Sequence, residues 1–269
     1  MSFRAILIPF FIAIQFLTRF PTFSMLRGNN DNLYSKKNIS RSLKYYPFIG
    51  FLIGTVLVGV GLLLQDHLQE HALYIAAIIV GLWIYSSGGL HLDGAADMAD
   101  AWIGGLGDKQ KTLDIMKDPV CGPFAVIAIV LLVLFKFVLV YEVLQYNIYI
   151  LLLSPLLART LVVVLMMTSP YVRENGIGSA LNTTSEKYKN SLSVLLFAAT
   201  SFFIYSFIVD VVILVAVYFL SVVFYYFFRR AVINRISGIT GDIAGALIEY
   251  TEVVVLFVFV SLYILVPVL

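Results

Sequence analysis

Long apolar runs alternate with short polar segments along this chain of 269 residues. Seven of the runs are close to the length that a helix needs to cross the hydrocarbon core of a bilayer. We predict these spans at residues 45–64, 72–89, 123–140, 148–167, 192–208, 211–228 and 253–268. Their length favours helices over strands, because a spanning helix satisfies its backbone hydrogen bonds internally. A further apolar run, residues 3–20, is at the short limit and is expected either to cross the membrane or to lie along its surface.

Composition agrees with a membrane protein. Hydrophobic residues make up 61% of the chain and charged residues 13%, whereas a soluble domain carries about 25% charged residues. The predicted fold class is therefore all-α: a polytopic integral membrane bundle of about seven transmembrane helices plus an N-terminal apolar helix, forming one domain over residues 1–269. A formal net charge of +2 gives no indication of nucleic-acid binding, and a lone cysteine excludes an internal disulfide framework. The sequence leaves open whether the protein is a homo-oligomer.

The distribution of Lys and Arg orients the predicted bundle. Five of these residues lie in 21–44, and three lie in each of 91–121, 169–190 and 229–252. The alternate connections, at 65–71, 141–147 and 209–210, contain none. Positively charged connections stay in the cytoplasm. We therefore expect the polar motifs in the connections that contain Lys and Arg to form one site at the cytoplasmic mouth of the bundle.

An acidic segment follows the second predicted span, at residues 88–100 (GGLHLDGAADMAD). Read as a helix, it places Asp93, Asp97 and Asp100 on one face, because they are separated by four and three positions. Like charges at this spacing repel, and a hard divalent cation such as Mg²⁺ would compensate them with oxygen ligands. The alternative is a solvated acidic loop, which has no need for the glycines and alanines placed among the carboxylates.

A second polar cluster, residues 235–252, precedes the last predicted span. Asp242, Glu249 and Glu252 again share a helical face. They are candidates for a second metal ion or for a supporting role, and the alternative is a solvated helix leading into the span. Between the two clusters, Lys117 offers a cation for a phosphate and Asp118 a fourth carboxylate.

Two basic residues interrupt predicted spans, where ionisable groups are costly and usually face a polar interior. Arg159 lies inside the fourth span and is expected to hold a substrate phosphate or to pair with a carboxylate. Lys136 lies in the third span, nearer the outer face, and we expect it to extend its ammonium group to the outer interface.

These motifs resemble those of the cobalamin synthases, also called adenosylcobinamide-GDP ribazoletransferases. The resemblance rests on the pattern Gly-Gly-x-His-x-Asp-Gly-x-x-Asp-x-x-Asp at 88–100, on Met116-Lys117-Asp118 followed by Gly122, and on residues 238–242 (GITGD) with Gly245, Ala246, Glu249 and Glu252. Weaker matches lie at 16–21, 46–50 and 171–173, so that the resemblance covers nearly the whole chain in order. The chain departs from the family pattern at Pro119, Pro123 and Ala125.

The resemblance implies the last assembly step of adenosylcobalamin (vitamin B12), in the cytoplasmic membrane of a bacterium or archaeon. Adenosylcobinamide-GDP would be joined to α-ribazole or α-ribazole 5′-phosphate with release of GMP, in a reaction that needs Mg²⁺. The expected metal ligands are Asp93, Asp97 and Asp100, joined by Asp242, Glu249 and Glu252 for a second ion or a supporting role. The expected substrate-binding residues are Lys117, Asp118, Arg159, Arg173, Arg235 and Thr240. His91 or a free carboxylate would accept the ribazole hydroxyl proton, or His91 would orient Asp93; the catalytic candidates are His91, Asp93, Asp97 and Asp100.

Three other functions share some of these features. CDP-alcohol phosphotransferases have a related aspartate arrangement but require an Asp-Gly-x-x-Ala-Arg segment, and here Asp97 follows Asp93-Gly94-Ala95-Ala96. Intramembrane prenyltransferases use paired Asp-x-x-x-Asp clusters and would consume a prenyl diphosphate. A membrane transporter would suit intramembrane charges, but its polar motifs would lie near the midplane and an inverted repeat is expected, which this sequence does not show.

Overall fold

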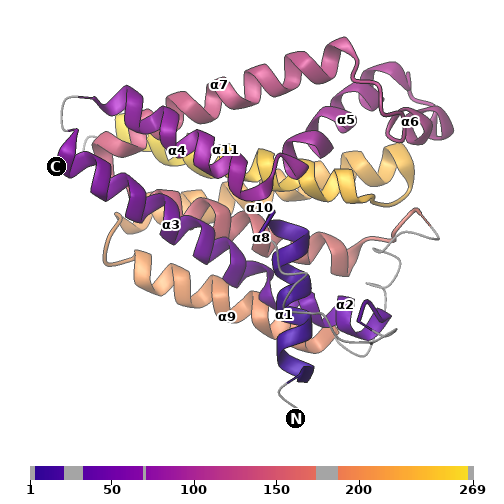
Figure 1. The fold of residues 1–269 in the computed structure, drawn as a ribbon, viewed down its shortest axis with the longest axis horizontal. Coiled ribbons are helices and arrows are strands. Elements are labelled where there is room, and N and C mark those ends of the chain that lie inside the picture. The colour runs from indigo at the N-terminus through magenta and orange to yellow at the C-terminus, as the bar shows by residue number, and fades with distance from the viewer. Residues whose placement is uncertain (1–3, 21–32, 69–70, 174–186, 266–269) are drawn as a thin grey trace.

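The computed structural model is a bundle of α-helices (Figure 1) and describes residues 4–20, 33–68, 71–173 and 187–265. Within these ranges no β-strand occurs beyond an isolated bridge between Tyr171 and Ile239. The predicted all-α membrane bundle is therefore confirmed. The elements are α1 Arg4–Leu17, α2 Lys36–Ser42, the 3-10 turn η1 Leu43–Tyr45, α3 Tyr46–His67, α4 Ala72–Ser87, α5 Leu90–Gly104, α6 Lys109–Ile115, α7 Pro123–Tyr146, α8 Ile150–Thr168, α9 Lys187–Tyr205, α10 Val211–Ile236 and α11 Gly241–Leu265.

Five helical segments of the described chain are long and apolar enough to cross a membrane: α2 continued into α3, α7, α8, α10 and α11. The pair α4 and α5 passes the same test only when taken together, with a bend of 86° between them, which gives up to six spans against the seven we predicted. The remaining predicted span, 192–208, falls on α9, whose first turn is polar (KYKN). Because α5 carries three aspartates and turns away from α4, we treat it as lying outside the membrane-spanning set.

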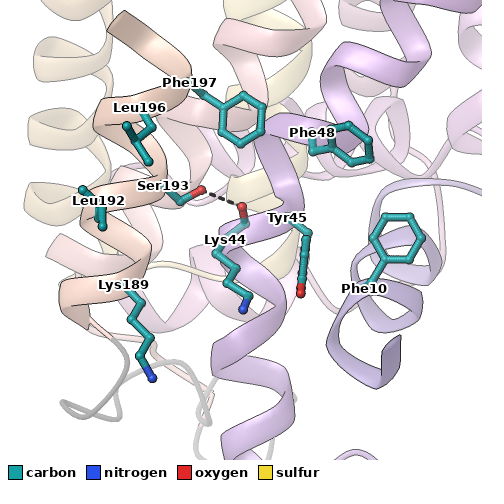
Figure 2. A pocket seen from close by; sticks show the side chains of 9 residues that line it. All are labelled: Phe10, Lys44, Tyr45, Phe48, Lys189, Leu192, Ser193, Leu196 and Phe197. Carbon is teal, nitrogen blue, oxygen red and sulfur yellow. Dashed lines mark hydrogen bonds between the residues drawn. The ribbon is translucent and has the colours of Figure 1, made fainter. Parts of the chain in front are cut away.

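The N-terminal apolar run forms the 14-residue helix α1. Figure 1 shows α1 running across the direction of α3 and α9, and this arrangement favours the surface position among our two alternatives. An open cavity lies between α1, the start of α3, and α9 (Figure 2).

Residues 229–252, between the last two predicted spans, are almost entirely helical. Helix α10 continues to Ile236, α11 begins at Gly241, and only a short turn separates them. In this turn Ser237 has a φ of 60°, in the left-handed region. We placed the ends of the predicted spans at 228 and 253, where charged residues begin, and both helices continue beyond these positions. The helical face predicted for Asp242, Glu249 and Glu252 is part of α11, in which buried ion pairs, described below, balance the two glutamates.

Helices α8 and α11 are the most buried of the long helices and form the centre of the bundle. Close packing of α3 on α8 depends on two glycines. A Cβ at Gly50 would lie 2.4 Å from the carbonyl oxygen of Pro155, and a Cβ at Gly54 would lie 2.4 Å from the Cα of Leu152. Small residues four positions apart let membrane helices approach in this way, and the resulting core fixes the position of α11.

Candidate active site

Two glycines turn the chain from α4 into α5. Gly88 and Gly89 have φ angles of 62° and 73°, a conformation that glycine adopts without the steric cost other residues pay. Gly88 is also covered by Arg19, since a Cβ there would lie 1.8 Å from the Arg19 Cγ. The backbone amide of Arg19 donates to the carbonyl of Ser86 at 3.1 Å. The Gly-Gly pair of the motif therefore directs α5, with its aspartates, away from the axis of α4.

Two further glycines bring the acidic motifs together, although about 150 positions separate them in the sequence. A Cβ at Gly94 of α5 would lie 2.6 Å from the carbonyl oxygen of Asp242 in α11. A Cβ at Gly245 of α11 would lie 3.2 Å from the Cα of His91. The backbones of α5 and α11 thus touch at the point where both motifs carry their polar side chains.

A cavity of about 410 Å³ opens at this contact. Its polar lining comes from three segments: His91 and Asp93 of α5, Arg173 of the segment after α8, and Asp242 of α11. Most of the remaining lining is apolar and comes from α1, α8 and α11, with Tyr46 and Tyr171 adding aromatic rings. Concave, mostly apolar pockets with a few convergent polar groups are typical of ligand sites.

Arg173 is held in place by the chain around it. Its Nη2 donates to Asp242 Oδ2 at 2.8 Å and to the Met116 carbonyl at 3.3 Å. The segment before it pairs with the turn between α10 and α11: the Val172 amide donates to the Ile239 carbonyl at 3.0 Å, and the Ile239 amide donates to the Pro170 carbonyl at 2.8 Å. The guanidinium is therefore placed at the cavity by backbone pairing.

Thr240 stabilises the start of α11. Its Oγ1 accepts a hydrogen bond from the Ile243 amide at 3.2 Å, as an N-cap side chain does. The same hydroxyl donates to Asp242 Oδ2 at 3.3 Å. The side chain of Thr240 is buried, and its visible role is to fix Asp242.

Asp97 lies one turn beyond Asp93 on α5 and is half-buried. Burial and the neighbouring charges of Asp93, Asp242 and Asp100 raise the pKa of Asp97 to about 6, and the Arg173 charge opposes this shift. Negative charge is therefore concentrated on this face of α5, as the spacing predicts. In the described residues, however, no three His, Cys, Asp or Glu side chains converge as a ready-made metal site.

Asp100 has a different environment. Its Oδ2 accepts from the Gly122 amide at 2.6 Å and its Oδ1 accepts from the Ala125 amide at 3.0 Å. These amides lie at the N-terminus of α7, so the Asp100 carboxylate caps that helix. Because its oxygens bind the backbone, the structure separates Asp100 from Asp93, with which we grouped it.

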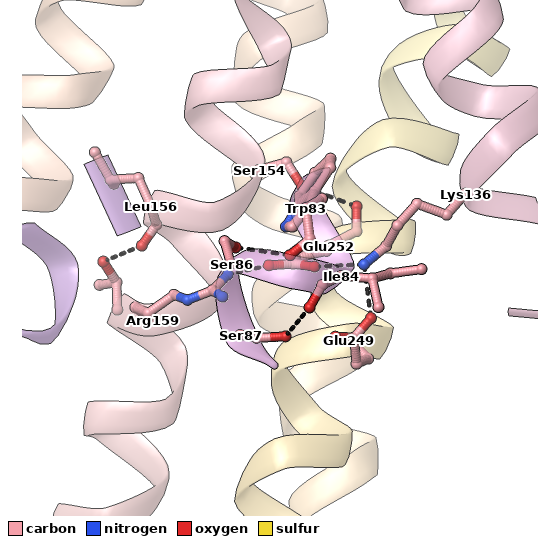
Figure 3. Close-up of polar contacts among 11 residues, drawn as sticks. Trp83, Ile84, Ser86, Ser87, Lys136, Ser154, Leu156, Arg159, Glu249 and Glu252 are labelled. Carbon is pink, nitrogen blue, oxygen red and sulfur yellow. Dashed lines mark hydrogen bonds and ion pairs between the residues drawn. The ribbon is translucent and has the colours of Figure 1, made fainter. Parts of the chain in front are cut away.

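Glu249 and Glu252 lie away from the cavity, in a buried ion-pair cluster (Figure 3). Lys136 Nζ is 2.6 Å from Glu249 Oε2 and 2.6 Å from Glu252 Oε2, and Arg159 pairs with Glu252 Oε1. Ser154 donates to the Glu252 carbonyl at 3.0 Å. The structure therefore does not bring these glutamates to the aspartates of α5.

The cluster also corrects our prediction for Lys136. Its side chain is 1% exposed, lies over the ring of Trp83 at 4.6 Å and does not reach the outer interface. Of the two roles predicted for Arg159, a contact to a substrate phosphate or a pair with a carboxylate, the structure shows the second, with Glu252 as the partner. The sequence contained a signal that we missed: a lysine inside a span needs a counter-charge. Glu249 and Glu252 of α11, just before the last predicted span, supply it.

The other substrate-binding candidates do not line the cavity. Arg235 donates from Nε to Thr112 Oγ1 at 3.0 Å and lies 5.6 Å from the Trp102 ring, so it ties α10 to α5 and α6. Lys117 and Asp118 are exposed, and Asp118 accepts from the Val120 amide at 3.0 Å. By contrast, the buried His91 has an Nδ1 atom without a hydrogen-bond partner among the described residues.

Comparison with known proteins shows one consistent group of relatives. A family model described as cobalamin-5-phosphate synthase matches residues 9–260. A protein of Acinetobacter baumannii (strain ACICU) named adenosylcobinamide-GDP ribazoletransferase is 38% identical over 264 residues, covering 95% of this chain and 98% of the relative. A protein of the same name from Pseudomonas fluorescens (strain SBW25) is 39% identical, and the match covers 93% of this chain and 98% of the relative. Another from Ectopseudomonas mendocina (strain ymp) is 42% identical, and the match covers 90% of this chain and 93% of the relative. No solved structure matches. The resemblance inferred from the motifs is confirmed, and the chain belongs to the cobalamin-5-phosphate synthase family.

Proposed function

We propose that this protein transfers adenosylcobinamide phosphate from adenosylcobinamide-GDP to α-ribazole or α-ribazole 5′-phosphate, with release of GMP. The observation that carries the proposal is the match to ribazoletransferases along almost the whole chain. With the Acinetobacter baumannii (strain ACICU) relative, the match extends over 264 residues. The product would be adenosylcobalamin or its 5′-phosphate, so the reaction is the last assembly step of that cofactor.

The reaction makes one P–O bond and breaks another. The ribazole hydroxyl oxygen bonds to the phosphorus that carries cobinamide, the bond from that phosphorus to the GMP oxygen breaks, and the hydroxyl proton passes to a base. The main obstacle is negative charge on the phosphate oxygens, which grows on the leaving GMP. Arg173 offers a guanidinium in the cavity, and such groups suit phosphate oxygens. Asp93, which lines the cavity, is the group placed to receive the proton. Burial and the charges of Arg159 and Lys136 lower the pKa of His91 to about 3, which favours the alternative that His91 orients Asp93.

The site offers Mg²⁺ a small number of carboxylate ligands. Mg²⁺ usually keeps several waters and binds one or two carboxylates together with substrate phosphates, so it does not need a cage of three protein ligands. Asp93 and Asp242 line the cavity, and the pKa of Asp97 is raised by burial and then by the charges of these two aspartates. We propose that Asp93 and Asp242 would hold the ion, with Asp97 adding negative charge beside them, and that the bound ion would neutralise charge at the diphosphate. We leave Asp100 out of this set because its oxygens accept two backbone amides, and Glu249 and Glu252 because they are buried in the ion-pair cluster and do not line the cavity.

We also propose that the site faces the cytoplasm. Arg173, Asp242 and α5 belong to the connections that contain Lys and Arg, whereas the alternate connections contain none. Positive connections remain on the cytoplasmic side, where GDP-activated substrates are made.

The proposal is tested with the detergent-solubilised, purified protein. Adenosylcobinamide-GDP and α-ribazole, with Mg²⁺, should give GMP and a cobalamin product in equal amounts. Asp93→Asn should lower GMP release by about 100-fold, whereas Asp66→Asn, a change at an exposed position in the last turn of α3 outside the cavity, should not change it. No GMP from the wild-type protein, together with consumption of a CDP-alcohol or a prenyl diphosphate, would assign one of the rival reactions instead.

A further inference from the structure

The cavity between α1, the start of α3, and α9 has no role in the proposed reaction (Figure 2). It measures about 580 Å³, is open to the outside and shares no lining residue with the active-site cavity. Its walls are apolar and its rim is basic, a combination that suits a ligand with a hydrocarbon chain and an anionic group.

The walls are hydrocarbon and aromatic. Phe10 of α1 lies 5.6 Å from the ring of Tyr45 and 6.2 Å from that of Phe48, and Phe48 lies 6.5 Å from Phe197 of α9. On α9, Leu192 and Leu196 are 44% and 57% exposed, so the apolar surface continues outward to the lipid-facing side. A flexible alkyl chain fits such a surface better than a polar metabolite does.

The rim carries two lysines. Figure 2 shows the amino groups of Lys44 and Lys189 at the same end of the cavity, away from Phe48 and Phe197. Among the described residues that line the cavity, none is acidic. Both lysines belong to the positively charged connections, 21–44 and 169–190, that we place on the cytoplasmic side. Lysines on that side of the bundle are suited to the anionic lipid phosphates of the cytoplasmic leaflet.

Hydrogen bonds hold the two sides of the cavity together. Ser193 of α9 donates to the carbonyl of Lys44 at 2.6 Å, and Asn190 donates to the carbonyl of Ser40 at 3.0 Å. Tyr45 donates from its hydroxyl to the carbonyl of Ile6 at 3.4 Å, which ties η1 to α1. The cavity is therefore formed before a ligand arrives, which reduces the entropic cost of binding.

We propose that this cavity binds one anionic phospholipid, with the phosphate at Lys44 and Lys189 and an acyl chain along the aromatic wall between α3 and α9. Basic pockets between membrane helices on the cytoplasmic side are suited to anionic headgroups. A free phosphate would leave the aromatic wall unused, and a zwitterionic lipid would gain little from two lysines because the cation of its own headgroup already balances the phosphate charge. The site does not depend on the proposed function, because binding is measured without substrate.

The test uses the full-length protein, delipidated in detergent, with phosphatidylglycerol and phosphatidylcholine added separately. Binding is counted by native mass spectrometry and checked by the shift of the thermal unfolding midpoint. Phosphatidylglycerol should bind more tightly, and each of Lys44→Met and Lys189→Met should lower that affinity by about fivefold. The matched control, Lys109→Met with Lys111→Met, removes two exposed charges from α6 and should leave the preference intact.

Other outcomes overturn the proposal. Equal binding of the two lipids by the wild-type protein would remove the role of the lysines. An unchanged preference in both cavity variants would locate the anionic lipid elsewhere. Stabilisation by inorganic phosphate equal to that by phosphatidylglycerol would show an anion site without an acyl groove. An unchanged melting temperature of the lipid-free variants, compared with wild type, separates lost binding from lost folding.

Discussion

At the scale of single residues, three similar aspartates on one helix face have different surroundings. Asp93 is exposed and lines the cavity, Asp97 is half-buried among like charges, and Asp100 accepts two amides from the start of α7. Spacing alone makes the three equivalent, because it reports the face of the helix and not what lies opposite. The position of α7 decides the role of Asp100, and that position is a tertiary property.

Asp100→Ala should therefore reduce stability and leave the metal requirement unchanged. Losing an N-cap side chain costs about 1 kcal/mol, whereas Asp100→Asn keeps one acceptor and should cost less. Thermal unfolding measures the first effect, and a Mg²⁺ titration of GMP release measures the second. Asp97→Asn is the matched comparison and should raise the Mg²⁺ concentration needed for half-maximal GMP release by at least about tenfold. A similar rise for Asp100→Asn at normal stability would restore Asp100 to the metal site.

At the scale of helices, the contact between α5 and α11 assembles the site. Gly94→Ala adds one carbon 2.6 Å from the Asp242 carbonyl, and opposing backbone cannot move as a side chain can. Overpacking of this kind costs about 1–3 kcal/mol, and the separation of Asp93 from Asp242 should lower activity at temperatures where the protein is still folded. Gly81→Ala in α4 is the control, since nothing lies within 4 Å of its added carbon. If both variants retain wild-type activity, the close contact is not needed for the reaction.

The buried ion pairs fix α11 to α7 and α8 at the same scale. Lys136→Met would leave Glu249 without its partner and Glu252 with Arg159 alone, and breaking a buried pair costs about 3–5 kcal/mol. Adding Glu249→Gln removes the uncompensated charge and should recover part of that loss. The measurement is the unfolding midpoint of the single and double variants. A double variant no more stable than the single one would mean that the cluster does not act through charge balance.

Sequence reasoning succeeded where a local pattern has a local cause. Apolar run lengths indicated the helices, and glycines at 88–89, 94 and 245 accompanied the turn and the close contact that join the two motifs. It failed where partners come from distant elements. The depth of Lys136 and its pairing with Glu249 depend on how α7 and α11 align, which no single-helix pattern records. The helix predicted at 88–100 is present as α5, but its 86° bend from α4 depends on packing that the spacing of the aspartates does not record.

At the scale of the whole molecule, the distribution of Lys and Arg predicts which end of the bundle faces the cytoplasm. Cys121 is exposed, just before α7, in the connection that carries the acidic motif. A membrane-impermeant maleimide should therefore fail to label it in intact cells and should label it after permeabilisation. In a Cys121→Ser background, Asp66→Cys probes the opposite end, because Asp66 is exposed in the last turn of α3, and this variant should be labelled in intact cells. The reverse pattern would place the cavity outside the cell, where a GDP-activated substrate made in the cytoplasm could not reach it.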